Sequence, residues 1–297
     1  MVTADSHAAK PKIASFRATL KPGQVETPFD LYFFRPTAYL FVRLALPTPL
    51  SANGMTVLSI ASGLAGAILF RFTDARSIYI ASGLTLLYGI LDCADGQLAR
   101  ARGTSSRLGR ILDGMSDYIV GVATGVTLAL HLHETHGDKG ALLAVGGLLS
   151  ILLQGTLFDH FKNRYLTLSG SSYREGDDLE ETRADIARLE HEGASFFHLI
   201  FYRIYALFLQ VQSTLGRKKK EGRPTAEQAS RYGRALAPVA RGWAFLGPST
   251  HGLLLGVCAC TGYLAEYVLF RLTVANVYML ALFLVQSARE KRVRNEG

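Results

Sequence analysis

The 297-residue sequence has little cysteine. Its three cysteines, Cys93, Cys258 and Cys260, have neither the paired spacing of a zinc site nor the pattern of an extracellular disulfide framework. We therefore expect reduced thiols with a structural role. A continuous apolar core is also missing from residues 1–35, so we expect no cleavable signal peptide there.

Apolar blocks of membrane-spanning length are present instead, in a chain that is 49% hydrophobic. Six blocks come near the roughly 20 residues that a helix needs to cross the hydrocarbon core. They cover residues 54–72, 78–98, 111–131, 140–161, 243–263 and 266–287. The sequence therefore predicts an all-α, polytopic membrane protein with six transmembrane helices.

Basic residues are scarce on one side of this predicted bundle. Its three short loops contain or adjoin only Arg71, Arg76, Lys139 and Arg271. Because lysine and arginine accumulate on the cytoplasmic side, the opposite side and both termini are predicted to be cytoplasmic. The net charge of +8 is thus spread along a membrane face, where anionic lipids attract it, so we expect a bilayer partner and no nucleic acid.

The cytoplasmic side has further predicted elements. Residues 30–46 and 196–211 combine apolar and aromatic side chains with internal charges, which favours amphipathic helices lying in the interface. Residues 177–192 are charged throughout and predict a solvated helix. We divide the chain into an amino-terminal arm with its interfacial helix, residues 1–50, and a membrane domain, residues 51–297, with a cytoplasmic insertion at about 162–241.

Aspartates interrupt the second and third apolar blocks. A carboxylate near the middle of a bilayer costs roughly 2.5–3.5 kcal/mol, so four of them need metal ions, water or cations nearby. Asp92 and Asp95 are three residues apart and Asp113 and Asp117 four apart, which places each pair on one helix face. Carboxylate oxygens suit Mg²⁺, and paired metals can clamp a displaced phosphorus, so the pattern predicts phosphoryl chemistry.

These residues resemble the signature of the CDP-alcohol phosphotransferases. The match, without a gap, consists of Asp92, Asp95, Gly96, Ala99, Arg100, Gly109, Asp113 and Asp117. Upstream, Asn53 and Thr56 resemble a second family element, although Ala52 stands where proline is common; helix capping by Ser51 or Asn53 explains that stretch equally well.

The resemblance implies attack of an alcohol hydroxyl on a CDP-linked donor, with release of cytidine monophosphate. It implies two Mg²⁺ ions, with Mn²⁺ as an alternative, held by Asp92, Asp95 and Asp113. Asp117 would be the general base and a possible further metal ligand. The CDP site would comprise Asn53, Thr56, Asp92, Gly96, Ala99, Arg100 and Gly109. A homodimer is also implied.

The acceptor alcohol is open. Arg107, Arg110, Arg241 and His251 favour an anionic acceptor, hence CDP-diacylglycerol as donor and a polyol or polyol phosphate as acceptor. The alternative joins CDP-choline or CDP-ethanolamine to diacylglycerol, and the motif is the same for both. A divalent-ion transporter is a remote alternative, which gives no reason for Gly96, Ala99, Arg100 and Gly109 at this spacing.

Overall fold

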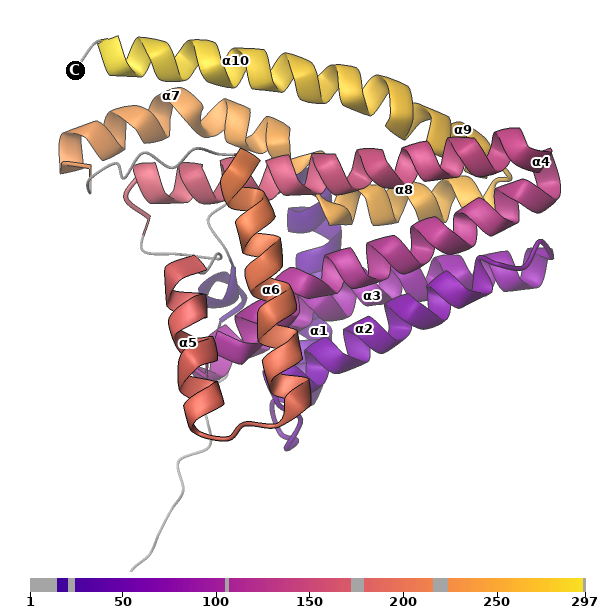
Figure 1. The fold of residues 1–297 in the computed structure, drawn as a ribbon, viewed down its shortest axis with the longest axis horizontal. Helices are drawn as coiled ribbons and strands as arrows, with labels where there is room; N and C mark the ends of the chain where they lie inside the picture. The colour runs from indigo at the N-terminus through magenta and orange to yellow at the C-terminus, as the bar shows by residue number, and fades with distance from the viewer. Residues whose placement is uncertain (1–14, 21–24, 105–106, 172–178, 216–223, 296–297) are drawn as a thin grey trace, which may run out of the picture.

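The computed structural model describes residues 15–20, 25–104, 107–171, 179–215 and 224–295, and every element in these ranges is a helix (Figure 1). In chain order they are η1 (Phe16–Thr19), η3 (Asp30–Phe34), α1 (Arg35–Ala45), α2 (Ala52–Leu69), α3 (Ala75–Arg102), α4 (Arg107–Leu168), α5 (Leu179–His191), α6 (Phe196–Leu215), α7 (Ala226–Ala244), α8 (Pro248–Cys260), α9 (Leu264–Phe270), η4 (Arg271–Ala275) and α10 (Asn276–Asn295).

Local capping fixes the two helices that precede the second aspartate pair. Ser51 Oγ accepts a hydrogen bond from the backbone N–H of Gly54 at 3.0 Å and starts α2. Asp74 does the same for α3 through the N–H of Ser77 at 2.9 Å. Gly103, with a φ of 65°, ends α3 in the left-handed conformation that glycine adopts without strain. Serine and aspartate caps of this kind are typical helix starts.

Helix α4 turns back on itself at Gly137, where φ is 64° and ψ is −156° (Figure 1). The two arms then pack side by side. Tyr118 on the first arm donates a hydrogen bond to Asp159 on the second at 3.3 Å. A Cβ atom added to Gly125 would lie 2.6 Å from Leu148, so the absence of a side chain there permits close approach of the arms.

Five ranges of the described chain are long and apolar enough to cross a membrane. They are Ala52–Leu69, Ala75–Arg102, Ile111–Leu168, Ala226–Cys260 and Leu264–Asn295. The third range contains both arms of α4, so these five ranges overlap all six predicted spans. The prediction of a polytopic all-α membrane protein is confirmed.

The helices beside the predicted insertion are longer than the sequence indicates. Helix α4 continues past residue 161 to Leu168, and α7 already begins at Ala226. Lys162 pairs with Asp159 at 3.0 Å, and Arg164 pairs with Glu290 of α10 at 2.9 Å. These charges look like the end of a span in the sequence, but ion pairs accommodate them within the helical bundle.

The amino-terminal helix α1 packs against α3. Ala38 and Val42 are fully buried there, whereas Leu40 and Leu44 are exposed, as an amphipathic helix requires. Arg102, near the end of α3, donates hydrogen bonds to the carbonyl oxygens of Leu50 at 2.5 Å and of Ala45 and Thr48 at 2.9 Å. The turn between α1 and α2 is thereby tied to the end of α3.

Helices α5 and α6 run across the direction of α4 and α10 in Figure 1. One side of α6 buries Tyr202 and Tyr205 against the first arm of α4. Another carries exposed apolar side chains, namely Phe196, Ile200, Ile204 and Leu207. This arrangement agrees with an interfacial helix, which stays a prediction.

Candidate active site

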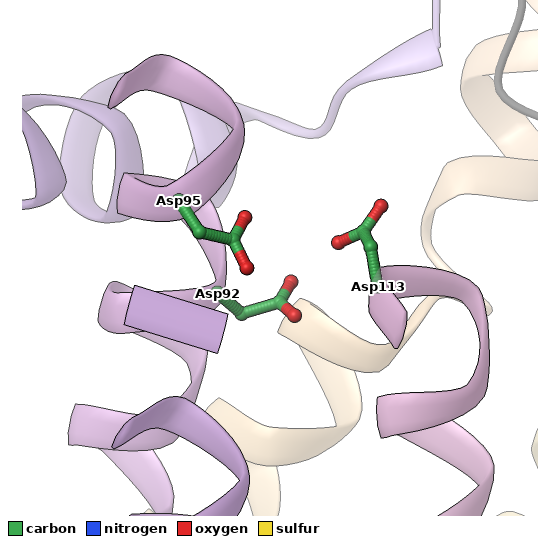
Figure 2. Close-up of side chains that lie close together, drawn as sticks. All are labelled: Asp92, Asp95 and Asp113. Carbon is green, nitrogen blue, oxygen red and sulfur yellow. The ribbon is translucent and has the colours of Figure 1, made fainter. Parts of the chain in front are cut away.

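Three of the four motif aspartates meet between α3 and α4. Asp92 and Asp95 lie on α3, and Asp113 faces them from the start of α4 (Figure 2). One carboxylate oxygen of each lies within 4.8 Å of the other two. Hard divalent cations prefer such oxygen ligands, so this aspartate cluster (Asp92, Asp95 and Asp113) can hold a divalent metal ion.

Hydroxyl groups from neighbouring turns orient the aspartate cluster. Thr56 of α2 donates a hydrogen bond to Asp95 at 2.5 Å, and Asp95 is only 4% exposed. The Ser116 hydroxyl lies 2.7 Å from the carbonyl oxygen of Asp113 and 3.2 Å from Asp92 Oδ1, so its single proton is shared between these two acceptors. Such donors hold the ionised carboxylates in place and leave their other lone pairs for a cation, so the donor set fits a metal.

Asp117 lies one turn beyond Asp113 but outside this group of three. The Tyr88 hydroxyl donates a hydrogen bond to its carboxylate at 2.5 Å and lies 3.5 Å from Ser116. Tyr88 is a site residue that the motif does not contain. Its sequence signal is the four-residue spacing before Asp92, which places both side chains on one face of α3.

A cavity of about 130 Å³ opens beside the aspartate cluster. Many of the residues that line it are far from the aspartate motif in the sequence. Its polar lining includes Glu26, Asp30, Arg35, Asp92, Asp113, Asp117, Asp159, Lys162, Asn163 and Ser249. This first cavity therefore combines the amino-terminal arm, both arms of α4 and the start of α8, and Tyr205 adds α6.

Among the described residues, two cationic side chains line the first cavity, and each of them belongs to an ion pair. Arg35 donates to Glu26 at 2.6 Å, with both side chains about 5% exposed or less. Burial opposes the charge of Arg35, yet Cys93 and Glu26 raise its pKa above the ordinary value, so it stays protonated. Lys162 pairs with Asp159 at 3.0 Å and lies 4.6 Å from the ring centre of Phe158.

A second cavity, of about 90 Å³, continues from the first. Asp92, Asp117, Pro248 and Ser249 line both cavities. The remaining wall of the second cavity is largely apolar, with residues such as Phe34, Val120, Ile151 and Leu255. Its polar groups away from the aspartates include His251, Tyr267 and Arg271.

The predicted CDP-binding residues come from α2, α3 and the start of α4. Asp92, Asp95, Gly96 and Ala99 follow each other at helical spacing on α3. Arg100 donates a hydrogen bond to the carbonyl oxygen of Thr19 at 2.7 Å, which holds η1 against α3. Asn53 and Gly109 are half-buried, and Thr56 is buried. Neither cavity is lined by Gly96, Ala99, Arg100 or Gly109.

The predicted acceptor residues are dispersed. Arg241 is exposed on α7 and lines neither cavity. His251 is buried and lines the second cavity, away from the first. The side chains of Arg107 and Arg110 lie outside the described part of the chain. Lys162 and Arg35, which do line the first cavity, were not in the predicted set.

Comparison with known proteins agrees with the aspartate pattern. Residues 50–161 match a family model described as CDP-alcohol phosphatidyltransferase. The chain carries a CDP-alcohol phosphatidyltransferase domain. The match spans α2, α3 and the first arm of α4, and it continues along the second arm of α4 to residue 161. It includes every residue of the aspartate motif. No curated protein matches the chain.

The CDP-alcohol phosphatidyltransferase domain identifies the chain as a transferase of substituted phosphate groups. The protein is a membrane phosphotransferase of phospholipid synthesis. The matched family generally depends on divalent metals. The aspartate cluster is a group of residues in this domain that can hold such a metal.

Proposed function

We propose that the protein transfers a substituted phosphate from a CDP-alcohol, CDP-diacylglycerol in the first instance, to a polyol or polyol phosphate, with release of cytidine monophosphate. The observation that carries this proposal is the aspartate cluster within the matched domain, opening into a cavity lined by further charged residues. The proposed catalytic domain extends beyond the matched segment to residues 51–297, because α6 and α8 also line the first cavity. The amino-terminal arm, residues 1–50, adds Glu26, Asp30 and Arg35 to that lining.

In this proposal Asp92, Asp95 and Asp113 hold Mg²⁺, as two ions, with Mn²⁺ as an alternative. Metal ions held by these residues would neutralise the diphosphate and would stabilise the leaving group. Thr56 and Ser116 keep the carboxylates oriented towards that site. The small residues Gly96 and Ala99 leave room for the nucleotide along α3. Asn53, Arg100 and Gly109 complete the CDP site, with Arg100 as the group that neutralises phosphate.

Asp117 accepts the proton of the attacking hydroxyl in the proposed mechanism. Its place in both cavities, one turn from Asp113, supports that role, since a hydroxyl beside it would also lie near the aspartate cluster. Tyr88 positions the carboxylate by its hydrogen bond. The alternative role of Asp117 is that of a further metal ligand.

Arg107, Arg110 and Arg241 remain the proposed acceptor residues for a phosphorylated polyol, and Lys162 joins them because it lines the first cavity. His251, the fourth residue of the predicted set, lines the second cavity instead. The alternative reaction is transfer of phosphocholine or phosphoethanolamine to diacylglycerol. It is favoured by the acidic side chains Glu26, Asp30 and Asp159 in the same cavity, which suit a cationic alcohol group. Divalent-ion transport is the remote alternative, since the aspartate cluster alone would also serve an ion.

The active site and both termini are proposed to face the cytoplasm, supported by the basic residues on that side. A homodimer stays a prediction, to be tested by light scattering of the purified protein.

The experiment that tests the proposal uses purified protein in lipid with Mg²⁺ and radiolabelled CDP-diacylglycerol. Glycerol phosphate, inositol phosphate, inositol and serine are offered in turn, and release of cytidine monophosphate is measured. Release with one acceptor, absent in Asp117→Asn, supports the proposal and identifies the acceptor. Release only from CDP-choline or CDP-ethanolamine with diacylglycerol would favour the alternative, and no release from any donor would contradict both.

A further inference from the structure

Arg271 is a buried cation inside an apolar range of the chain. It is 5% exposed and begins η4, within the membrane-crossing candidate Leu264–Asn295. It donates hydrogen bonds to the carbonyl oxygen of Gly147 at 2.7 Å and to the hydroxyl of Tyr267 at 3.4 Å. No carboxylate pairs with it in the described residues, and its Nε–H has no partner there. A guanidinium in such a place is costly, which indicates a functional role.

Arg271 lines the second cavity together with His251. His251 is 3% exposed, and its Nε2 atom has no hydrogen-bond partner within the described part of the chain. The Tyr267 hydroxyl connects the two residues, because it lies 3.4 Å from His251 Nδ1 and donates to the His251 carbonyl oxygen at 3.1 Å. The polar end of this cavity is therefore a connected group in which two buried nitrogen atoms, Arg271 Nε and His251 Nε2, have no partner among the described residues.

The backbone at Arg271 is also unusual. Residues Arg271–Ala275 form a turn of π-helix, a feature that is frequent at functional sites. Gln154, which is fully buried on the second arm of α4, donates to the carbonyl oxygen of Arg271 at 3.2 Å and to Asn276 at 2.8 Å. These hydrogen bonds hold the π-helical turn in place, and they thereby fix the backbone from which the Arg271 side chain extends.

The chemistry of the second cavity restricts its occupant. A guanidinium only donates hydrogen bonds, so a group that contacts Arg271 in this cavity must be an acceptor. The wall formed by Phe34, Val120, Ile151 and Leu255 gives no compensation for the lost hydration of a small free anion. An uncharged oxygen on an apolar molecule meets both conditions. Because Asp92 and Asp117 line the same cavity, that molecule also reaches the reacting groups.

We propose that the second cavity binds the glyceryl ester part of the lipid substrate, with Arg271 donating a hydrogen bond to an ester carbonyl oxygen. This inference rests on the proposed function, since it takes the lipid to be a reactant. The ester group has two possible sources, CDP-diacylglycerol as donor or diacylglycerol as acceptor. Both carry the same ester groups on the glycerol, whose third oxygen is bonded to the reacting phosphorus in CDP-diacylglycerol and is the attacking oxygen in diacylglycerol.

The test compares ester and ether lipids that have the same chain length. CDP-diacylglycerol and CDP-dialkylglycerol are offered separately to the wild-type protein, and kcat/KM for release of cytidine monophosphate is measured. The ether lipid lacks the carbonyl oxygen, so the ester lipid is expected to be favoured about tenfold. The parallel comparison of diacylglycerol with dialkylglycerol, using CDP-choline and CDP-ethanolamine, tells which source the protein uses.

Two variants assign the preference to this cavity. Arg271→Lys keeps the charge and removes Nε–H, so the ester preference is expected to fall close to one. Arg164→Lys is the matched control, because Arg164 pairs with Glu290 away from both cavities, and the full preference should remain. Gly121→Leu is a second route if Arg271→Lys does not fold. A Cβ atom on Gly121 meets no heavy atom within 4 Å, so the new side chain enters the cavity and should raise KM for the lipid.

Equal use of ester and ether lipids by the wild type would overturn the inference, as would an undiminished preference in a folded Arg271→Lys. An unchanged lipid KM in Gly121→Leu would also contradict it. If no lipid gives turnover, the proposed reaction is contradicted, and lipid binding then tests the role of the second cavity by itself. Diacyl lipids should then raise the thermal unfolding midpoint more than dialkyl lipids in wild type but not in Arg271→Lys, and equal midpoint shifts in wild type would overturn it.

Discussion

Tyr88 of α3 donates a hydrogen bond to Asp117 of α4 across the helix interface, at 2.5 Å. The backbone of Tyr88 is held as well, because the Ser59 hydroxyl of α2 donates a hydrogen bond to the Tyr88 carbonyl oxygen at 3.1 Å. Three helices thus determine the position of one carboxylate. In the proposed mechanism that carboxylate has to meet the attacking hydroxyl in a defined direction, so its positioning matters for the rate.

Tyr88→Phe is therefore expected to lower kcat by about tenfold or more, because Asp117 loses a charge-assisted hydrogen bond and its fixed orientation. KM for the CDP donor should change little, since the aspartate cluster is untouched. Tyr278→Phe is the control: its hydroxyl donates to Gly242 at 3.0 Å and lies outside both cavities. Initial rates of cytidine monophosphate release measure both variants, and an unchanged kcat in Tyr88→Phe would contradict the positioning role.

Thr56→Val tests the support of the aspartate cluster. Valine has nearly the shape of threonine but cannot donate to Asp95, and loss of such a supporting hydrogen bond typically costs 10–100-fold in metal affinity or activity. The Mg²⁺ concentration for half-maximal activity should rise within that range. Ser62→Ala removes a hydroxyl on the same helix that donates to Leu84 at 3.0 Å, and it should leave the Mg²⁺ dependence as it is. An equal rise in both variants would indicate a general loosening of α2.

The sequence was enough to group Asp92, Asp95 and Asp113, whose carboxylate oxygens lie within 4.8 Å of one another, whereas Asp117, predicted with them, lies outside that group. Helical spacing places Asp92 with Asp95 and Asp113 near Asp117, and the cost of membrane carboxylates requires a common partner. The apolar blocks likewise predict the spans, because each needs about 20 residues whatever the tertiary contacts are. These features depend on local periodicity and on the bilayer as solvent, both of which a single sequence contains.

The rest of the site depends on contacts between distant segments. Arg271 looks like a charge flanking a short loop, and only the packing of η4 against Gly147 brings it to a cavity wall. Lys162 looks like the end of a span until its ion pair with Asp159 is known. Glu26 belongs to an arm without a motif, and its burial beside Arg35 follows from the docking of that arm on α3.

Asp117→Asn tests the division of roles within the motif. The amide keeps the shape of the side chain and the contact with Tyr88 but cannot accept a proton, so turnover should be abolished. Binding of the CDP donor should persist, because Asp92, Asp95 and Asp113 remain. Calorimetry with CDP and Mg²⁺ measures this directly. Loss of CDP binding in a folded Asp117→Asn protein would instead assign Asp117 to the metal site.

The buried pair of Glu26 and Arg35 predicts how strongly the amino-terminal arm is held. Glu26→Gln leaves a buried guanidinium without its ionic partner, and breaking such a pair typically costs 3–5 kcal/mol of stability. The thermal unfolding midpoint should fall clearly in lipid nanodiscs. Glu192→Gln, in a pair with Arg188 that is exposed and 3.9 Å apart, should change the midpoint little.

The double variant Glu26→Gln with Arg35→Met separates the pair from the individual side chains. It removes both charges, so no uncompensated ion remains, and its midpoint should lie above that of Glu26→Gln alone. Midpoint losses that simply add would show that the two residues act independently, against the 2.6 Å contact. Because Arg35 also donates to the Cys93 carbonyl oxygen at 3.4 Å, next to Asp92, the double variant should in addition lower kcat through a displaced α3 backbone.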